Sequence, residues 1–194
     1  EGEQAWNEFQ NFILVAKTDT LAQFGSGFYI DLHGHGHTNQ RLELGYLLSS
    51  TQLGHSDTTL NSPTYENQSS IRTLSQQSPL SFPELLRGTG SLGALIAAEG
   101  YPAVPSPDIP DPGSDPYFNG GYNTEQHGSV NGGNISGLQI ECNMTGVRDS
   151  TANRAAFAQA LARVLEAYMD THYGIRLREC VRSIWHSGSG NWSN

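Results

Sequence analysis

Three histidines lie within five residues of one another in the segment Asp31-Leu32-His33-Gly34-His35-Gly36-His37. Imidazole is the commonest protein ligand for zinc and carries protons near neutral pH. Asp31, His33 and His35 alternate, so on an extended backbone their side chains share one face. A carboxylate so placed can orient a neighbouring imidazole, and a His-x-His pair can bind one metal ion. The segment predicts a metal or catalytic site, against the alternative of a glycine-rich turn with solvent-exposed histidines.

Glu141 is a second residue whose setting suggests chemistry. It lies in the segment 137–142 (GLQIEC), where the apolar neighbours predict a buried strand. A carboxylate in such a strand must be paired, bound to a metal or shifted in pKa, and a raised pKa suits a general base. The sequence therefore offers Glu141 as a general base, with an ion pair to Arg148 or Arg154 as the alternative.

Residues 117–129 combine aromatic, amide and imidazole side chains on a glycine-rich stretch. Loops of this kind often recognise substrate above a cleft. Tyr122 and His127 are therefore candidate substrate contacts, and an ordinary polar surface loop is the alternative.

Several arginines have two readings each. Arg87 and Arg148 can each bind a carboxylate bidentately, or each can serve a structural role near a helix end. The first alternative makes Arg148 a third candidate for substrate contact. Arg41 and Glu43 are expected to form a structural ion pair, because they are close neighbours of opposite charge.

The elements expected to position these residues alternate between strands and helices. Apolar residues recur with the helical period in some segments and alternate or run continuously in others. The expected helices are 4–22, 63–76, 92–99 and 152–173, and the expected strands are 27–33, 41–48 and 137–142, with a long loop over 102–133. This alternation predicts an α/β fold, in which ligands collect at the carboxyl ends of strands. Asp31, His33 and Glu141 fall near such ends, so one cleft could gather them.

Length and composition bound the other properties. The 194 residues suffice for one domain, predicted over 1–176, followed by a partly flexible tail over 177–194. The net charge of −9 argues against nucleic acid, and no apolar run approaches the roughly 18 residues that span a bilayer. The start without Met suggests a removed leader or a processed fragment, and a secreted or periplasmic location is expected. Cys142 and Cys180 allow one disulfide, and four N-x-S/T sequons are present: Asn67, Asn134, Asn143 and Asn191.

The segments 27–37 (GFYIDLHGHGH), 41–48 (RLELGYLL), 117–129 and 137–142 together resemble the N-formylglutamate amidohydrolase family, a branch of the carboxypeptidase-type zinc hydrolases. The resemblance covers most of residues 4–174. It implies an α/β fold with a mixed sheet flanked by helices, a single zinc ion, and hydrolysis of linear amide bonds such as that of N-formylglutamate.

The resemblance also implies roles for individual residues. His33 matches a zinc ligand at a strand end, and Glu141 matches the glutamate that activates water. His35 then becomes a further ligand or a hydrogen-bond donor to the transition state. The expected partner is a small-molecule or peptide amide substrate.

The chain departs from the family at one point, because it contains no H-x-x-E motif, which supplies two further zinc ligands. Three interpretations remain open. The chain can be the C-terminal part of a longer or cleaved hydrolase, which is the favoured interpretation and allows an N-terminal companion chain. His33, His35 and His37 can instead build a substitute site. Finally, the fold can serve as a non-catalytic secreted structural or binding domain that self-associates.

Overall fold

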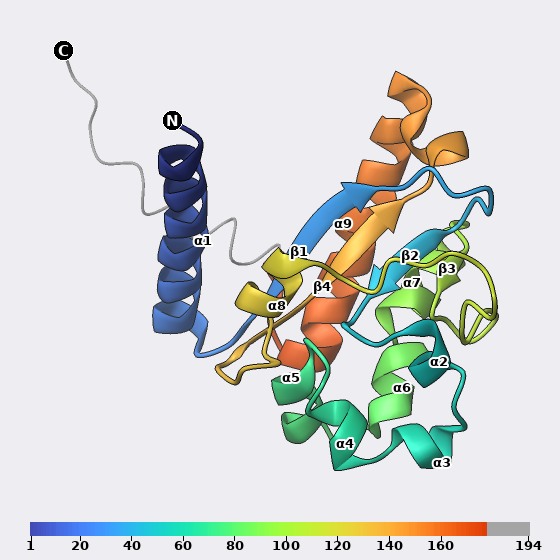
Figure 1. Ribbon diagram of the computed structural model, residues 1–194, viewed down its shortest axis with the longest axis horizontal. Coiled ribbons are helices and arrows are strands. Elements are labelled where there is room, and N and C mark those ends of the chain that lie inside the picture. The colour runs from blue at the N-terminus through green and yellow to red at the C-terminus, as the bar shows by residue number, and fades with distance from the viewer. Residues whose placement is uncertain (178–194) are drawn as a thin grey trace.

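The computed structural model describes residues 1–177, which form a four-stranded mixed sheet flanked by helices (Figure 1). The strands are β1 (Gly27–Gly34), β2 (Leu42–Gly45), β3 (Ala103–Val104) and β4 (Ile135–Cys142). The helices are α1 (Gly2–Phe24), α2 (Ser50–Leu53), α3 (Asp57–Leu60), α4 (Pro63–Glu66), α5 (Arg72–Gln77), α6 (Phe82–Arg87), α7 (Leu92–Ala98), α8 (Tyr122–His127) and α9 (Thr151–Tyr173), with a short turn η1 (Met144–Arg148) before α9. The predicted α/β class is confirmed.

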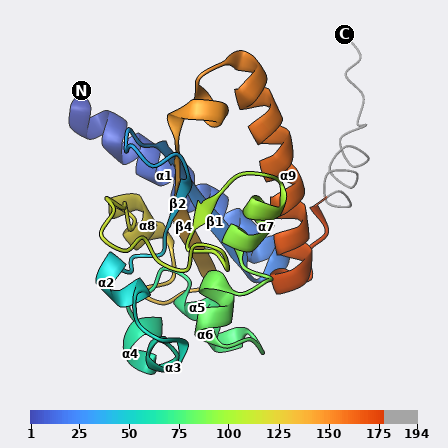
Figure 2. The ribbon, with the colours of Figure 1, turned by 90° about the vertical axis from the view of Figure 1, so that its right-hand side faces the viewer.

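The sheet order is β1-β4-β2-β3. β1 runs parallel to β4, β2 runs antiparallel to β4, and β2 runs parallel to β3. β1 and β4 therefore end at the same side of the sheet, where ligands collect in α/β folds. Figure 2 shows α7 and α9 on one side of the sheet and α8 on the other.

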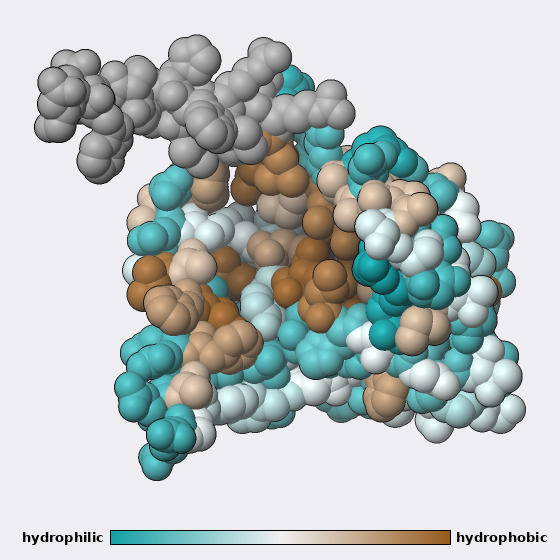
Figure 3. Space-filling view, turned by 90° about the horizontal axis from the view of Figure 1, so that it is seen from above, coloured by the Kyte–Doolittle hydropathy of each residue, from teal (hydrophilic) through white to brown (hydrophobic). Residues whose placement is uncertain are grey.

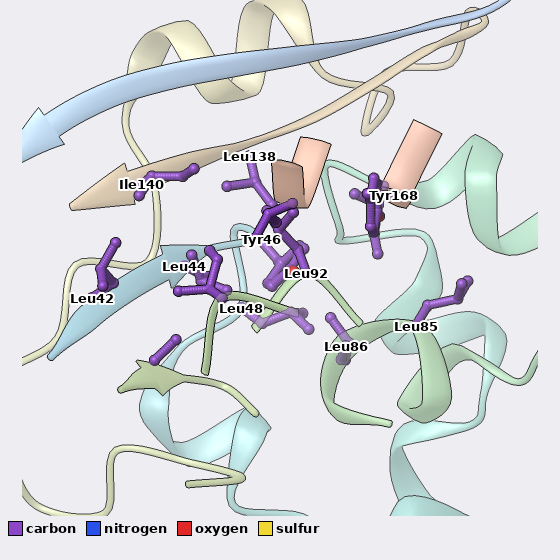
Figure 4. Packing of buried hydrophobic residues seen from close by; sticks show 14 of the residues in the cluster. Leu42, Leu44, Tyr46, Leu48, Leu85, Leu86, Leu92, Leu138, Ile140 and Tyr168 are labelled. Carbon is purple, nitrogen blue, oxygen red and sulfur yellow. The ribbon is translucent and has the colours of Figure 1, made fainter. Parts of the chain in front are cut away.

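The two faces of the sheet differ because side chains alternate along each strand. Leu42, Leu44, Leu138 and Ile140 are fully buried on one face and join a continuous apolar cluster (Figure 4). The cluster also holds, among others, Tyr46, Leu48, Leu85, Leu86, Leu92 and Tyr168. Full burial of one leucine side chain stabilises the fold by about 1.5–3 kcal/mol. The intervening residues, among them Glu43 and Glu141, face the opposite side, so the core supports a polar face directly behind it.

Most elements begin and end where the sequence indicates. The expected helix 152–173 is confirmed as α9, whose N-cap Ser150 accepts a hydrogen bond from the Asn153 N–H and whose C-cap is Gly174 in the left-handed region. The helix expected over 4–22 is confirmed as α1, and the helix expected over 92–99 is confirmed as α7. The strands over 27–33 and 137–142 are confirmed as β1 and β4.

Three expectations of secondary structure are wrong. The single helix 63–76 is two helices, because the Ser70 N–H between them donates to the Tyr46 carbonyl and leaves the helical ladder. The strand 41–48 is only β2, because the backbone turns at Leu47, which has a φ of 66°. The loop 102–133 contains β3 and α8, which are short enough to escape a periodicity search. Cys142 is buried, whereas Cys180 and the predicted flexible tail lie outside the described residues, apart from Leu177.

α1 lies along the side of the sheet where β1 forms the edge, and none of its residues is buried. Its exposed apolar side chains include Phe9, Phe12, Leu14 and Val15. Figure 3 shows apolar side chains gathered on both sides of a hollow on this face. A largely apolar cavity of about 570 Å³ lies between β1 and α9, lined by residues that include Leu32, Phe157, Leu161 and Leu165.

Across residues 1–177, no helix has the length and apolarity to cross a bilayer.

Candidate functional site

A row of polar residues crosses three strands on the face opposite the core. The strand register pairs His33 with Glu141, and Glu141 in turn with Glu43. The next row pairs Asp31 with Gln139. Residues that are direct neighbours across strands bring their side chains together. The structure therefore gathers Asp31, His33 and Glu141 near the carboxyl ends of β1 and β4.

His33 is held from one side by a carboxylate. Its Nε2 lies 3.1 Å from Asp31 Oδ1, and its Nδ1 lies 4.0 Å from Glu141 Oε1. When the Nε2–H donates to Asp31, the lone pair on Nδ1 faces Glu141 and is available to an ion or a substrate. The His33 side chain is 48% exposed, so this nitrogen can be reached from solvent.

Glu141 is buried, with 6% exposure, and its two carboxylate oxygens differ. Gln139 Nε2–H donates to Oε1 at 2.7 Å, whereas Oε2 has no hydrogen-bond partner in the part of the chain that the structure describes. Burial raises the pKa of Glu141, and the nearby Glu43 adds to this, while His33, His35 and the Gln139 hydrogen bond act in the opposite direction.

The alternative of an ion pair between Glu141 and a nearby arginine is wrong. Arg148 donates from Nε to the Cys142 carbonyl at 2.9 Å and from Nη2 to the His35 carbonyl at 2.5 Å. Arg154 donates to the Arg148 carbonyl and to a threonine hydroxyl. Both guanidinium groups are therefore engaged by other partners.

Glu43, at one end of this row, also belongs to a second cluster with His35 and His37. One ligand atom from each residue lies within 4.8 Å of those of the other two, so the group could hold a metal ion. His37 Nδ1 is 2.7 Å from Glu43 Oε1, and the Phe118 N–H donates to Glu43 Oε2 at 2.8 Å. The expected ion pair between Arg41 and Glu43 is wrong, because Arg41 pairs with Asp115 at 3.2 Å.

His35 has a specific place in this cluster. His35 is buried, with 2% of the residue exposed. Its Nε2 lies 2.8 Å from the Arg41 carbonyl oxygen, and its Nδ1 accepts a hydrogen bond from the His37 N–H at 3.1 Å. Both ring nitrogens thus contact the backbone, so a direct role for His35 requires it to give up the longer of these contacts. Its role as a ligand or transition-state donor stays a prediction.

Tyr122 and His127 contact α1 rather than the polar row. The Tyr122 ring lies 5.2 Å from that of Trp6, and His127 Nε2 lies 2.7 Å from Gln10 Oε1. The His127 ring also lies 5.1 Å from that of Tyr29, and burial together with Lys17 lowers the pKa of His127, while the nearby Asp31 acts in the opposite direction. Their roles as substrate contacts stay predictions, and the described contacts favour a role in holding α1.

Sequence reasoning missed Gln139 and gave Glu43 a different role. Both residues share the polar face with Glu141: Gln139 lies two residues before it in β4, and Glu43 lies directly across from it in β2. The detectable signal for Glu43 was the same as for Glu141, namely an acidic residue between apolar neighbours in a predicted strand. Arg87 has the structural role near a helix end, because it donates to the Leu53 and His55 carbonyls after α2 and, through Nε and Nη2, to the single oxygen Oδ1 of Asp57.

Arg148→Lys is expected to destabilise the protein by about 1–2 kcal/mol, because a single ammonium cannot replace both hydrogen bonds to the ends of β1 and β4. Urea unfolding measures the change. The control Arg163→Lys alters an exposed pair with Glu99 and should cost at most about 1 kcal/mol. If Arg148 instead contacts substrate, KM rises while the unfolding midpoint stays unchanged.

Comparison with family models, curated proteins and solved structures finds no match for this chain. What the site does is therefore inferred from the geometry of its own residues.

Proposed function

We propose that this chain provides the general base and a metal ligand of a zinc-dependent hydrolase that cleaves the amide bond of N-acyl amino acids, of which N-formylglutamate is the model. The carboxypeptidase-like form of the α/β fold belongs to the same proposal. The proposal rests on one observation: the strand register pairs His33 with the buried Glu141, and His33 Nδ1 lies 4.0 Å from Glu141 Oε1.

The residues around His33 fit one position of a zinc site. A carboxylate on the far nitrogen of a histidine, as Asp31 is here, orients the ring and raises its basicity toward a metal. His33 would hold the ion, and its further ligands are not found next to it in residues 1–177. A zinc ion bound there would polarise the amide carbonyl and acidify water.

The other side chains of the site divide the proton chemistry between them. Gln139 donates to one lone pair of Glu141 Oε1, and the second lone pair of this oxygen, which lies 4.0 Å from His33 Nδ1, would take a proton from the attacking water. The raised pKa of Glu141 brings the carboxylate closer to the proton affinity that a base needs. Glu141 can then deliver this proton to the leaving amine nitrogen, which completes the cleavage into an acid and an amine.

The proposal is tested by measuring formate and acetate release from N-formyl-L-glutamate and a panel of N-acetyl amino acids, with the protein expressed from its complete gene. We expect zinc-dependent release, and a rate reduced by about 100-fold or more in His33→Ala. His55→Ala is the matched control, since the His55 ring packs at a tilt against Tyr65, with the ring centroids 5.3 Å apart, and in the described part of the chain no hydrogen bond or ion pair joins it to the polar row. Absence of hydrolysis across the panel in the zinc-loaded protein would refute the proposal.

A second candidate function is a non-catalytic binding or structural domain. It is favoured by the apolar side chains that α1 exposes, which monomeric proteins seldom gather on one element. This candidate predicts concentration-dependent self-association in sedimentation velocity experiments, lost in a Phe9→Ser/Phe12→Ser variant, together with no hydrolysis of the same panel.

A further inference from the structure

We propose that His35, His37 and Glu43 bind a second divalent ion of the zinc type, which has a structural role and is separate from the ion at His33. This inference does not depend on the hydrolase activity. It rests on the donor set, the supports behind each donor, the charge of Glu43 and the burial of the cluster.

The donor set matches what zinc binds in proteins. Two imidazole rings and one carboxylate converge, with all three ligand atoms within 4.8 Å of one another. Mixed nitrogen and carboxylate oxygen sets of this kind suit zinc and its neighbours rather than magnesium or calcium, which take oxygen. The pair His37 Nδ1 and Glu43 Oε1, at 2.7 Å, needs only a small opening to admit an ion.

Each donor is held from behind by a separate contact. The His35 Nε2–H donates to the Arg41 carbonyl, so Nδ1 is unprotonated, and this nitrogen binds the ion in exchange for the 3.1 Å hydrogen bond that it accepts from the His37 N–H. The Phe118 N–H holds Glu43 Oε2, and the Phe118 ring stacks on His37 with centroids 4.6 Å apart and a 20° angle. Contacts of this type, from backbone to the far atom of a ligand, orient side chains in metal sites.

The charge of Glu43 is the strongest single reason for an ion. The residue is 0% exposed, and its partners in the described chain are an imidazole and one backbone N–H. A buried carboxylate is costly unless a cation compensates it. Arg41, two residues before Glu43 in the sequence, pairs with Asp115 instead. A divalent ion at this position supplies the missing positive charge.

The burial of the cluster indicates what the ion does. Structural zinc sites commonly have four protein ligands, whereas catalytic sites have three and keep one position open to water and substrate. The three donors here leave one position for a water molecule, so the role of the ion is argued from burial, which keeps substrate away from this position. His35 and Glu43 are almost completely buried, while the His33 side chain is 48% exposed. An ion in the closed cluster would tie the segment 35–41 and the backbone at Phe118 to β2, next to the polar row.

The test separates this ion from the one at His33. Metal-depleted His33→Ala protein is titrated with zinc by calorimetry, and its melting temperature is recorded with and without zinc. We expect one zinc ion per chain and a zinc-dependent rise in melting temperature. Adding Glu43→Gln or His37→Ala to this background should weaken binding by about 100-fold or more. Glu125→Gln, on the exposed surface of α8, is the matched control and should leave binding unchanged.

Either of two results would overturn the proposal. The first is that folded His33→Ala protein, verified by circular dichroism, binds no zinc. The second is that Glu43→Gln and His37→Ala each bind zinc as tightly as the background protein. Because the readouts are stoichiometry and melting temperature, failure of the hydrolase proposal leaves this test intact, and the reverse also holds.

Discussion

Glu141→Gln is expected to lower amide hydrolysis by about 10²–10⁴-fold and to stabilise the metal-free protein at neutral pH by about 1 kcal/mol. The loss of activity follows because a neutral amide cannot accept the proton from water. The gain in stability follows because the variant removes a buried charge whose Oε2 has no partner within residues 1–177. A residue that improves function at the expense of stability is typical of active sites.

The gain in stability should depend on pH in a defined direction. Burial raises the pKa of Glu141 above its usual 4.5, so the folded protein binds this proton more tightly than the unfolded chain. The contribution of Glu141 to stability is therefore full below pH 4.5, falls as pH rises through the raised pKa, and stays low above it. The difference between Glu141→Gln and wild type should vanish in acid and reach its maximum near neutrality.

Thermal unfolding in the presence of a chelator, at a series of pH values, measures this difference. Glu125→Gln serves as the control, because the exposed Glu125 should show no such trend. A Glu141→Gln protein that hydrolyses substrate at a rate close to that of wild type would show that another group is the base. A variant less stable than wild type at neutral pH would show that the carboxylate is compensated in the metal-free protein.

Gly45→Ala is expected to destabilise the protein by about 3–5 kcal/mol and to reduce activity. A Cβ at this position would lie 2.4 Å from Gly120 N and 2.6 Å from the Asn119 carbonyl carbon, so the backbone there must move. This movement breaks the 2.6 Å hydrogen bond from the Leu47 N–H to Asn119 and the Phe118 contact to Glu43. Overpacking costs about 1–3 kcal/mol, and each hydrogen bond adds about 1 kcal/mol.

Urea unfolding and zinc binding together measure the effect of Gly45→Ala. Gly36→Ala is the matched control, since no heavy atom lies within 4 Å of its added Cβ and its φ is not positive. The control should stay within about 0.5 kcal/mol of wild type. Equal unfolding midpoints for the two variants would mean that the segment over Gly45 shifts without cost.

The strands that carry His33 and Glu141 could be predicted from sequence because their signal is local. Each is a short apolar run with a polar residue near its end. The role of Glu43 could not be predicted in the same way, because it depends on β2 lying on the far side of β4 from β1. Strand order is a property of the whole sheet, and no residue near Glu43 encodes it.

The same distinction explains the other departures from expectation. α8 is a six-residue helix without a side-chain N-cap, so neither a periodic pattern nor a capping residue marks it in the sequence. Tyr122 was expected over a cleft because of its composition, whereas its ring packs near Trp6 from the opposite end of the sequence. Arg41 was assigned a partner two residues away, and its partner is Asp115, beyond the reach of any local pattern.

The pairing of β1 with β4 has a consequence for how the protein folds. It joins Gly27–Gly34 to a strand more than a hundred residues later, with β2 and β3 formed in between. Closing so long a loop costs conformational entropy before the contacts between the strands contribute favourable free energy, so such pairings form slowly. We therefore expect His33 and Glu141 to meet late in folding. Under the proposed function, hydrolase activity would then require the completely folded chain, and a partly folded chain would be inactive.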